Sequence, residues 1–519
     1  MANQTVLTNL IGGSRKSNMA KINSSFTMNM YSETQGEGAS STEILRSIFG
    51  TSVYLEMPEE KCRGIKLCSF GQDREPVLFA VFGTGVYVIR KDGPSCTKIG
   101  QISSTCIYVS MCETGGQGSA HPHLVVVDGT SVFAVDTSFS DNDMIADWRS
   151  IELPKNALDV LIKPTHCAYI KGFLLVNDIL SDGIYKSFQY PFETLVAGTD
   201  QINYDIFMLA EYNGYGWVTY SELSPDALTS IISTGTDLWT FGPRSYQVWT
   251  WKDDVNQPIT PLDTTAEEIG IRAPYSVAML GPMVFWLGAS DIGQNGIYVG
   301  KAGTIVKISN PDIEREISGM TYPEDALGQC WSENGHEFYA ITFFTDNKTF
   351  VYDLLEKQWH NRCTREAKLN VYNFWEPQFG ALAYNKLIFG TLSDKYLIFL
   401  DPNSFEEYDG RNMIRLRESG FTLSSYSPMI IESFQLIANN GFINDISLNP
   451  RIMLRCKRDG GSYSNVAQRR LGRIGQYDYQ SNFDRLGIGR LWSFEISYSE
   501  KTDFVIINGK ILSSQVGRF

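Results

Sequence analysis

Residue patterns that hold metals or cofactors are scarce in this chain. Its 519 residues include five histidines and nine cysteines, and no Cys-x-x-Cys occurs. His121 and His123 flank a proline and could share a metal, but no carboxylate or cysteine follows at a spacing typical of metal sites. We therefore expect no metal and no cofactor.

The sequence also lacks the short motifs of common enzyme classes. It has no Gly-x-Ser-x-Gly elbow, no Gly-Lys-Ser/Thr phosphate loop and no His-Glu-x-x-His helix. A propeller glycosidase needs two carboxylates across the scissile bond, and the candidates are Asp253-Asp254 and Glu267-Glu268. Adjacent residues of a strand point to opposite faces, so neither doublet forms such a pair by itself. We expect no enzymatic activity, and a glycan-binding or glycan-cleaving propeller is the alternative.

Long apolar runs are absent as well. No run approaches the ~20 residues that a membrane-spanning helix needs, and the opening MANQTVLTNLIGG lacks the cationic start and apolar core of a signal peptide. We expect neither export nor a membrane segment. The odd number and scattered positions of the cysteines indicate reduced, mostly buried thiols made in a cytoplasm.

Helix signals are few, with short helices possible only at 41–48 and 154–162. In contrast, the chain has 26 Tyr, 29 Phe and 45 Gly. The aromatic and β-branched residues form short runs bounded by Gly, Asp and Asn, which is typical of an all-β protein. We expect strand content well above the ~20–25% of an average protein and helix content below about 15%.

A loose repeat of strand, short turn and strand fills the middle of the chain. Its seven units begin at positions 78, 124, 172, 230, 283, 337 and 386. Four short strands in every ~40–50 residues are typical of a β-propeller. We predict seven blades, with six or eight as alternatives.

The segments on either side of the repeat differ from it. Phe26, Met28 and Met30 alternate with polar residues and predict a docked strand in an otherwise extended arm. Beyond Gly420 the repeat stops, and further apolar runs predict a β-sandwich or small barrel. The predicted domains are an N-terminal arm (1–60), a β-propeller (61–420) and a C-terminal β-domain (421–519).

The C-terminal domain contains a stretch of unusual charge. Between Arg451 and Arg490 nine basic and three acidic residues give +6, whereas the whole chain carries −14, which leaves −20 elsewhere. The arginines are spaced among glycines and aromatics, which argues against a disordered basic tail. The stretch is either a solvated basic edge or a docking surface for an acidic partner. The residues assigned to docking or subunit contacts are Arg469, Arg470, Arg473, Arg485 and Arg490.

Nucleic-acid binding is a further possibility for this stretch. Tyr477, Tyr479 and Phe483 could stack on bases beside the arginines. Asp478 and Asp484 interrupt the basic stretch, and a sequence-independent DNA grip does not suit so acidic a body. We therefore favour a protein partner.

The order of motifs at both ends resembles a phage protein family. An Asp-Gly-Gly turn at 459–461 is followed by Arg-x-x-Gly-Arg at 469–473, Gly-x-Tyr at 475–477, Asp-Arg-Leu-Gly at 484–487 and Arg-x-Trp-x-Phe at 490–494. Together with Phe-Thr-Met-Asn-Met-Tyr near the N-terminus, this order resembles the tail nozzle or hub proteins of short-tailed bacteriophages, also called packaged-DNA stabilisation proteins. The positions that match the family's structural motifs are Asn29, Tyr31, Gly472, Tyr477, Gly487 and Trp492. The chain departs from the pattern at 48–50, where Pro-Gly is expected, and at Phe483, where Trp is expected.

The resemblance implies a structural virion protein. Family members form a tail ring, with six copies expected, that extends the DNA channel below the portal and its adaptor. They retain packaged DNA and provide attachment for tail spikes, fibres or a needle. For this chain it implies a location in the phage tail after assembly in the bacterial cytoplasm, with DNA passing through without tight binding.

Overall fold

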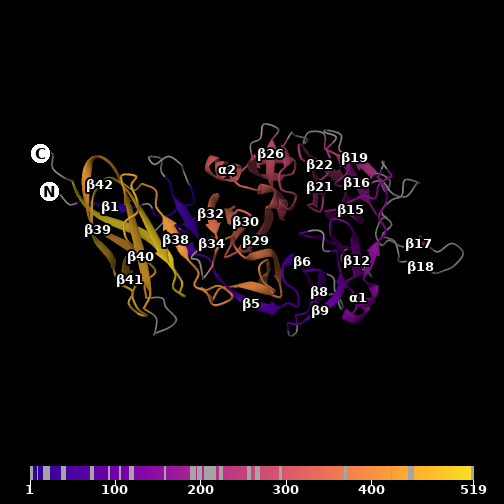
Figure 1. The fold of residues 1–519 in the computed structure, drawn as a ribbon, viewed down its shortest axis with the longest axis horizontal. Helices are drawn as coiled ribbons and strands as arrows, with labels where there is room; N and C mark the ends of the chain where they lie inside the picture. The colour runs from indigo at the N-terminus through magenta and orange to yellow at the C-terminus, as the bar shows by residue number, and fades with distance from the viewer. Residues whose placement is uncertain are drawn as a thin grey trace.

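The computed structural model is an elongated molecule with a β-propeller at one end and a C-terminal β-domain at the other (Figure 1). Strands account for about 57% of it and helices for about 5%, which confirms the predicted all-β propeller fold. None of its described helices is long and apolar enough to cross a membrane. The structure describes residues 4–8, 10–15, 24–36, 43–69, 75–91, 94–103, 107–115, 122–156, 159–187, 194–195, 202–203, 218–220, 226–253, 259–262, 269–290, 295–366, 371–421, 423–441 and 449–515.

Seven antiparallel groups of strands in the described chain form the blades of the propeller; six are separate sheets, and the strands of blade six belong to a 14-stranded sheet that continues into the C-terminal domain. Blade one consists of β6 (Cys62–Cys68), β7 (Val77–Phe82), β8 (Gly85–Ile89) and β9 (Cys96–Gln101). Blade two consists of β10 (Ser110–Thr114), β11 (His123–Val127), β12 (Val132–Asp136) and β13 (Arg149–Ile151). Blade three consists of β14 (Cys167–Ile170), β15 (Phe173–Asn177), β16 (Gly183–Lys186) and β19 (Val218–Tyr220). Blade four consists of β20 (Ser230–Ser233), β21 (Asp237–Phe241), β22 (Tyr246–Trp251) and β23 (Ile259–Pro261). Blade five consists of β24 (Ile269–Ile271), β25 (Ala278–Leu280), β26 (Met283–Ser290), β27 (Asn295–Lys301) and β28 (Thr304–Lys307). Blade six consists of β29 (Leu327–Glu333), β30 (His336–Phe343), β31 (Lys348–Asp353) and β32 (Gln358–Arg362). Blade seven consists of β35 (Pro377–Ala383), β36 (Lys386–Thr391), β37 (Tyr396–Asp401) and β5 (Gly50–Glu56).

The blades bury both faces against their neighbours. Every residue of β7, β8 and β11 is buried, because these central strands are apolar on both sides. Inner strands of neighbouring blades contact one another, for example β10 with β14 and β25 with β29, and the contact of β35 with β6 closes the ring. Radial packing of this kind leaves only short strand edges open to solvent.

The predicted repeat has one unit for each blade, but most units begin one strand later than the blade does. Six of the seven predicted units begin at the second strand of a blade, for example at β7, β11 and β30. The inner strands escaped notice because they are short or rich in small and polar residues, as in Ala-Met-Leu of β25 and Ser-Met-Cys-Glu-Thr of β10.

Blade seven takes its outer strand from the N-terminal segment. β5 pairs antiparallel with β37, and Asp401 lies opposite Gly50. The chain therefore closes the propeller with a strand that precedes all other blade strands in sequence. The predicted domain boundaries at 60 and 420 remain predictions, and β5 lies within the segment that was predicted to be an arm.

The C-terminal β-domain is built on three long strands. These are β39 (Leu423–Ala438), β42 (Ser481–Tyr498) and β43 (Val505–Gln515), and β39 lies between the other two. The far end of β42 continues between β38 (Arg415–Glu418) and β40 (Arg451–Arg458), and β41 (Ala467–Arg470) lies at the edge beside β40. One apolar core includes Phe434, Trp492 and Phe494.

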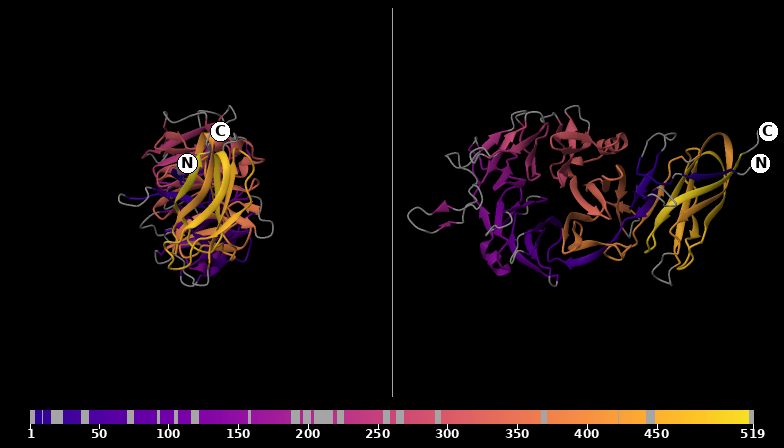
Figure 2. Two further views of the ribbon diagram at one scale, coloured as in Figure 1. Left: turned by 90° about the vertical axis from the view of Figure 1, so that its left-hand side faces the viewer. Right: turned by 180° about the vertical axis from the view of Figure 1, so that it is seen from behind.

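Strands from the N-terminus complete this domain and connect it to the propeller. β1 (Gln4–Thr8) and β4 (Glu43–Ser47) pair with β43, and β3 (Met30–Thr34) pairs with β4. β2 (Phe26–Met28) pairs with β38 and touches β32 of blade six. Figure 2 shows the indigo N-terminal strands beside the yellow C-terminal domain.

Helices are short and capped by polar side chains. Ser140 caps α1 (Asp141–Asp147) and Asn310 caps α2 (Pro311–Ser318), each accepting a hydrogen bond from backbone N–H. Two short 3₁₀ turns, η2 (Pro274–Ser276) and η3 (Pro323–Asp325), and the pairs β17 (Thr194–Leu195) with β18 (Ile202–Asn203) and β33 (Thr364–Glu366) with β34 (Val371–Asn373) complete the described elements. The segment 41–48, where a short helix was possible, contains the strand β4 instead, which pairs with β3 and β43. At 154–162 a bridge between Lys155 and Leu161 replaces the predicted helix among the described residues.

Candidate functional site

The basic stretch lies on β40, β41 and β42 of the C-terminal domain and on the loops between them (Figure 1). All five arginines assigned to docking are exposed: Arg469, Arg470, Arg473, Arg485 and Arg490. We call these five residues, with Arg451, the arginine surface.

Like charges lie opposite each other within this surface. Arg451 of β40 is the direct cross-strand neighbour of Arg470 of β41. Such pairs are destabilising in a free sheet, and no described carboxylate forms an ion pair with any member of the arginine surface. By contrast, cations on the propeller are often paired, such as Arg90 with Asp141 and Arg272 with Glu324.

The acidic residues of the stretch do not neutralise it. The carboxylate of Asp459 accepts hydrogen bonds from the backbone N–H groups of Arg490 (2.7 Å) and Leu491 (2.9 Å). These backbone donors, with that of Leu491 first, lower the pKa of Asp459. The nearby Glu495 is used by Arg455, whose guanidinium holds it in a bidentate pair.

One member of the arginine surface is fixed by the fold. Arg469 donates from Nε to the Asn482 carbonyl (2.8 Å), and its guanidinium lies 5.5 Å from the Phe483 ring centre. Phe483 is buried in the core of the domain. The charge of Arg469 is therefore held in place at the surface rather than on a free side chain.

Exposed apolar side chains lie in the same segments. Val466, Ile474, Tyr477 and Ile488 are all exposed, and Tyr477 is the most exposed at 61%. They lie beside the arginines in sequence, in β42 and in the loops that flank β41. Arginine and tyrosine mixed with aliphatic residues are the composition of protein contact surfaces.

The two glycines that match the family motif adopt a backbone that favours glycine. Gly472 has φ +104° and Gly487 has φ +103°. A Cβ at Gly487 would lie 2.6 Å from Nη1 of Arg458, so a side chain there would displace that arginine. Of the other motif residues in this domain, Trp492 is fully buried and Tyr477 is exposed.

The two N-terminal motif residues lie together where the arm meets blade six. Asn29 is fully buried and has φ +55°. Its Nδ2 donates to the carbonyls of Cys363 (3.1 Å) and Ile414 (2.8 Å), and its Oδ1 accepts from the Cys363 N–H (2.9 Å). One side chain therefore joins the arm to the end of blade six and to the segment that leads into β38.

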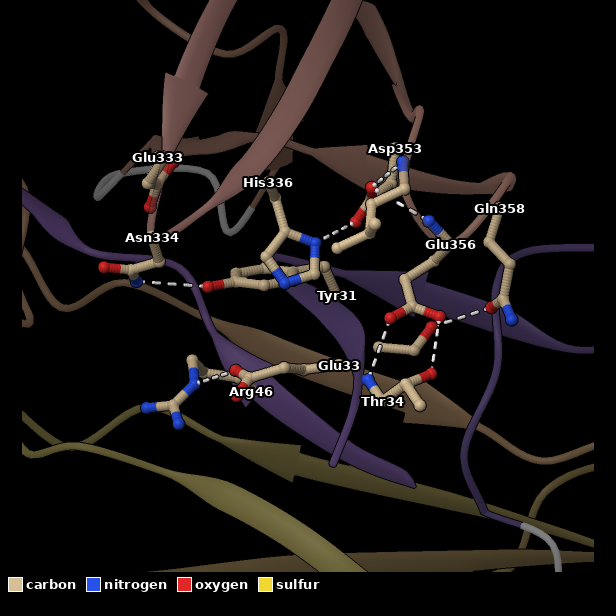
Figure 3. A network of polar contacts seen from close by, with 12 residues as sticks. Tyr31, Glu33, Thr34, Arg46, Glu333, Asn334, His336, Asp353, Glu356 and Gln358 are labelled. Carbon is tan, nitrogen blue, oxygen red and sulfur yellow. Dashed lines mark hydrogen bonds and ion pairs between the residues drawn. The ribbon is translucent and has the colours of Figure 1, made fainter. Parts of the chain in front are cut away.

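Tyr31 continues this junction, as Figure 3 shows. Its ring contacts His336 and Phe338 edge to face at centre distances of 4.9 and 5.4 Å, and its hydroxyl accepts from Nδ2 of Asn334. Beside it, Glu356 of blade six accepts hydrogen bonds from the backbone and hydroxyl of Thr34. The arm is therefore docked on the propeller through buried, specific contacts.

Buried arginines, which the sequence analysis overlooked, tie the arm to β38. Arg417 donates to the carbonyls of Leu10 (2.7 Å) and Gly12 (2.8 Å). Arg415 donates to Ser47 Oγ (2.8 Å) and to the Glu500 carbonyl (2.7 Å). Burial lowers the pKa of both arginines to about 10. The alternation Arg-Leu-Arg-Glu at 415–418 was their only sequence signal, and it reads equally as an exposed strand face.

The junction predicts a large effect of a small substitution. Asn29→Ala leaves a buried N–H and two buried carbonyls without their partner, and alanine is disfavoured at φ +55°. We expect a loss of about 2–4 kcal/mol in the free energy of unfolding, measured by chemical denaturation. Asn334→Ala is the matched control, because Asn334 also has positive φ and contacts the arm but is exposed. Equal losses in the two variants would contradict this role of Asn29.

The same junction contains a buried pair that responds to pH. His336 Nδ1 lies 2.7 Å from Asp353 Oδ2, and this hydrogen bond raises the pKa of His336 although burial opposes it. A histidine whose pKa is higher in the folded state than in the unfolded state stabilises the fold fully below the unfolded pKa of about 6.5. This contribution to stability is lost as the pH rises through the folded pKa. We expect His336→Gln to lose more stability relative to the parent at pH 5.5 than at pH 9.

His166 provides a control of opposite sign. Burial lowers the pKa of His166 to about 4, so its contribution is present above about pH 6.5 and is lost as pH falls toward 4. The stability deficit of His166→Gln should therefore be larger at pH 9 than at pH 5.5. Parallel pH dependence of the two variants in thermal denaturation would contradict the assignment for His336.

The carboxylates considered for glycan cleavage gain no support from the structure. Asp253 is exposed after β22, and Asp254, Glu267 and Glu268 lie outside the described residues, as does His121. His123 is buried in blade two.

A family model locates the propeller among known proteins. Residues 184–405 match the model described as bacteriophage P22 Gp10, β-propeller. Over these residues, which are less than half of the chain, the sequence is similar to the propeller of the packaged-DNA stabilisation proteins of short-tailed phages. This match supports the resemblance noted at both ends of the sequence. The matched family consists of phage virion proteins associated with the tail, which supports a location in the virion.

Other comparisons found only distant similarity. Among curated proteins no relative matches the chain. Among solved structures, a chain of "Crystal Structure of Mitotic Checkpoint Complex" is 11% identical, with 71% of this chain and 96% of that chain covered and a TM-score of 0.40. A chain of "Crystal structure of BBS1N in complex with ARL6DN, soaked with mercury" is 12% identical, with 69% and 97% covered and a TM-score of 0.40.

Proposed function

We propose that this protein is a packaged-DNA stabilisation protein and a subunit of the tail nozzle or hub. Six copies form a ring that extends the DNA channel below the portal and adaptor, retains the packaged DNA and provides attachment for tail spikes, fibres or a needle. The protein acts by assembly and not by catalysis. The observation that carries the proposal is the arginine surface, because its unpaired charges and exposed apolar residues fit a protein partner.

The packed interior of the propeller favours a channel that lies between the copies of a ring, rather than a channel through a single copy. Rings from four blades meet around Tyr108, which lies 5.2 Å from Tyr275, 5.8 Å from Phe344 and 5.7 Å from Phe379, measured between ring centres. These residues lie next to or within inner or second strands of blades two, five, six and seven. A DNA duplex does not fit where rings from opposite blades are in contact, so DNA would pass between copies.

Charge also favours a protein partner over DNA at the arginine surface. A chain of −14 in six copies repels DNA from most of its surface. Each phosphate that pairs with a fixed cation would slow ejection, since release of condensed counterions strengthens binding. Arginines that are buried in contacts with protein do not pair with phosphates and so do not slow ejection.

Electron microscopy of the purified protein, alone and with portal and adaptor, tests the proposal. We expect rings that stack below the adaptor. Separate monomers that do not bind the adaptor but cleave or bind polysaccharide would contradict it and favour the glycan alternative.

A further inference from the structure

A groove of about 730 Å³ lies where the arm, blade six and the C-terminal strands meet. Its described lining includes residues 11–15 of the arm, residues 357–359 at the start of β32, and Arg417 of β38 with the two residues 420–421 that follow this strand. We call it the junction groove. Its volume lies within the range of ~300–1,000 Å³ that is typical of ligand sites. No member of the arginine surface belongs to this lining, so the junction groove is a separate feature.

A buried arginine presents one nitrogen to the junction groove. Arg417 is only 2% exposed, and its Nε and Nη1 are held by backbone carbonyls of the arm at 10–13. Its Nη2 has no hydrogen-bond partner among the described residues, and a Cβ at Gly12 of the groove wall would lie 3.7 Å from this nitrogen. Because water screens a buried guanidinium little, a carboxylate that reaches Nη2 would form a charge-assisted hydrogen bond.

Two uncharged side chains of the lining also retain donors. Asn310 Oδ1 accepts hydrogen bonds from the backbone N–H groups of Asp312 (3.1 Å) and Ile313 (2.9 Å) at the start of α2. Gln358 Oε1 accepts a hydrogen bond from Ser32 Oγ (2.7 Å), as Figure 3 shows. Since both amide oxygens are engaged within the fold, the amide nitrogens of Asn310 and Gln358 remain as donors for a ligand.

The lining is positively charged although the chain is acidic. Its described residues include three basic side chains, Arg15, Lys357 and Arg417, and one acidic side chain, Glu43, which gives +2. Arg15 and Lys357 are exposed, and neither is ion-paired with a described residue. The whole chain carries −14. Positive charge combined with hydrogen-bond donors fits a ligand that carries negative charge and acceptors.

A peptide with acidic side chains suits the junction groove better than DNA does. A groove of this size admits a single extended chain but not a DNA duplex. The negative charge of the rest of the chain also repels DNA at long range. Each carboxylate has two oxygens that accept several hydrogen bonds, so it can contact a guanidinium and an amide nitrogen together.

We propose that the junction groove binds a short acidic segment of a partner protein through at least two aspartate or glutamate carboxylates. One carboxylate accepts from Nη2 of Arg417, and a second pairs with Arg15 or Lys357 at the groove rim. The bound segment touches the arm, blade six and the C-terminal strands at once, so it would hold these three parts in one arrangement. The proposal does not depend on the formation of a ring.

Binding of a fluorescein-labelled peptide of six glutamates tests this site. Fluorescence anisotropy is measured on the full-length variant in which Arg469, Arg470 and Arg473 are glutamate, so that the arginine surface does not bind the peptide. We expect saturable binding that weakens as salt is added, and no binding of a six-glutamine peptide at the same concentrations. A carbodiimide should couple the bound peptide to the Lys357 amine and not to Lys301, which is exposed in blade five.

Paired variants locate the contact. Arg15→Gln combined with Lys357→Gln should weaken peptide binding more than tenfold, whereas Lys171→Gln combined with Lys301→Gln should change it less than twofold. All four side chains are exposed, and a circular dichroism spectrum checks that each variant is folded. The proposal is overturned by absence of saturable binding, by equal losses in the two pairs, or by coupling mainly to lysines outside the groove. Tighter binding of a single-stranded DNA hexamer than of the glutamate peptide would overturn it in favour of a nucleic-acid ligand.

Discussion

Reversal of Arg469, Arg470 and Arg473 to glutamate is expected to leave the fold intact and to reduce incorporation into tails more than tenfold. The three side chains are exposed, and none of them is ion-paired with a described carboxylate, so their replacement breaks no ion pair. Only Arg469 also loses a hydrogen bond to the Asn482 carbonyl and a contact with the Phe483 ring at the surface of the core. A partner with complementary negative charge would instead meet three repulsive charges, and like-charge contacts cost several kcal/mol. The measurement is the amount of the variant in purified particles, beside a circular dichroism spectrum of the free protein.

A matched triple variant separates position from charge. Lys91, Lys171 and Lys301 are exposed on the propeller and are likewise not ion-paired with a described residue, so their reversal to glutamate changes net charge by the same amount. This control should assemble normally. Particles that contain the arginine triple variant at the parental level would contradict the docking role of the arginine surface.

Trp492→Ala is expected to lower the free energy of unfolding of the C-terminal domain by about 3–5 kcal/mol. The indole is fully buried and stacks on Phe494 at a ring-centre distance of 6.2 Å. Trp492 and Phe494 are two residues apart on β42 and therefore point to the same face of the strand, and both lie in the core cluster of the domain. The domain is not tested in isolation, because β1 and β4 from the N-terminus complete it.

Hydrogen exchange of the amides of β42 in the full-length chain reports this loss. Ile488→Ala is the control on the same strand, because Ile488 is exposed and should lose less than about 0.5 kcal/mol. Similar effects of the two substitutions on exchange would show that the face assignment of Trp492 is wrong.

The propeller could be predicted from the sequence because its central strands have a strong local pattern. β7, β15 and β30 are apolar runs bounded by turns, and they recur at a nearly constant interval. Closure of blade seven could not be predicted, because the pairing of β5 with β37 joins segments more than 300 residues apart. The pattern of residues 43–47 suits a helix or a strand equally, and only the neighbours β3 and β43 decide for a strand.

For the candidate site, too, some features could be predicted from the sequence and others could not. Exposure of the five arginines could be predicted from their spacing among glycines and turns. The roles of Asn29 and Arg417 could not, because the hydrogen-bond partners of the Asn29 side chain and of the Arg417 guanidinium lie hundreds of residues away in sequence. A buried arginine that donates to carbonyls also looks like a surface arginine in sequence.

The most direct test of the central claim is a high-resolution reconstruction of the tail with this protein in place. We predict a ring of copies in which the arginine surface is buried against protein and the channel wall is net negative. Acidic residues at the wall would keep DNA centred and unbound, whereas acidity that serves only solubility would also be found on the outer face. A channel lined by a continuous track of arginine and lysine from this chain would contradict the account and would favour a protein that grips DNA directly.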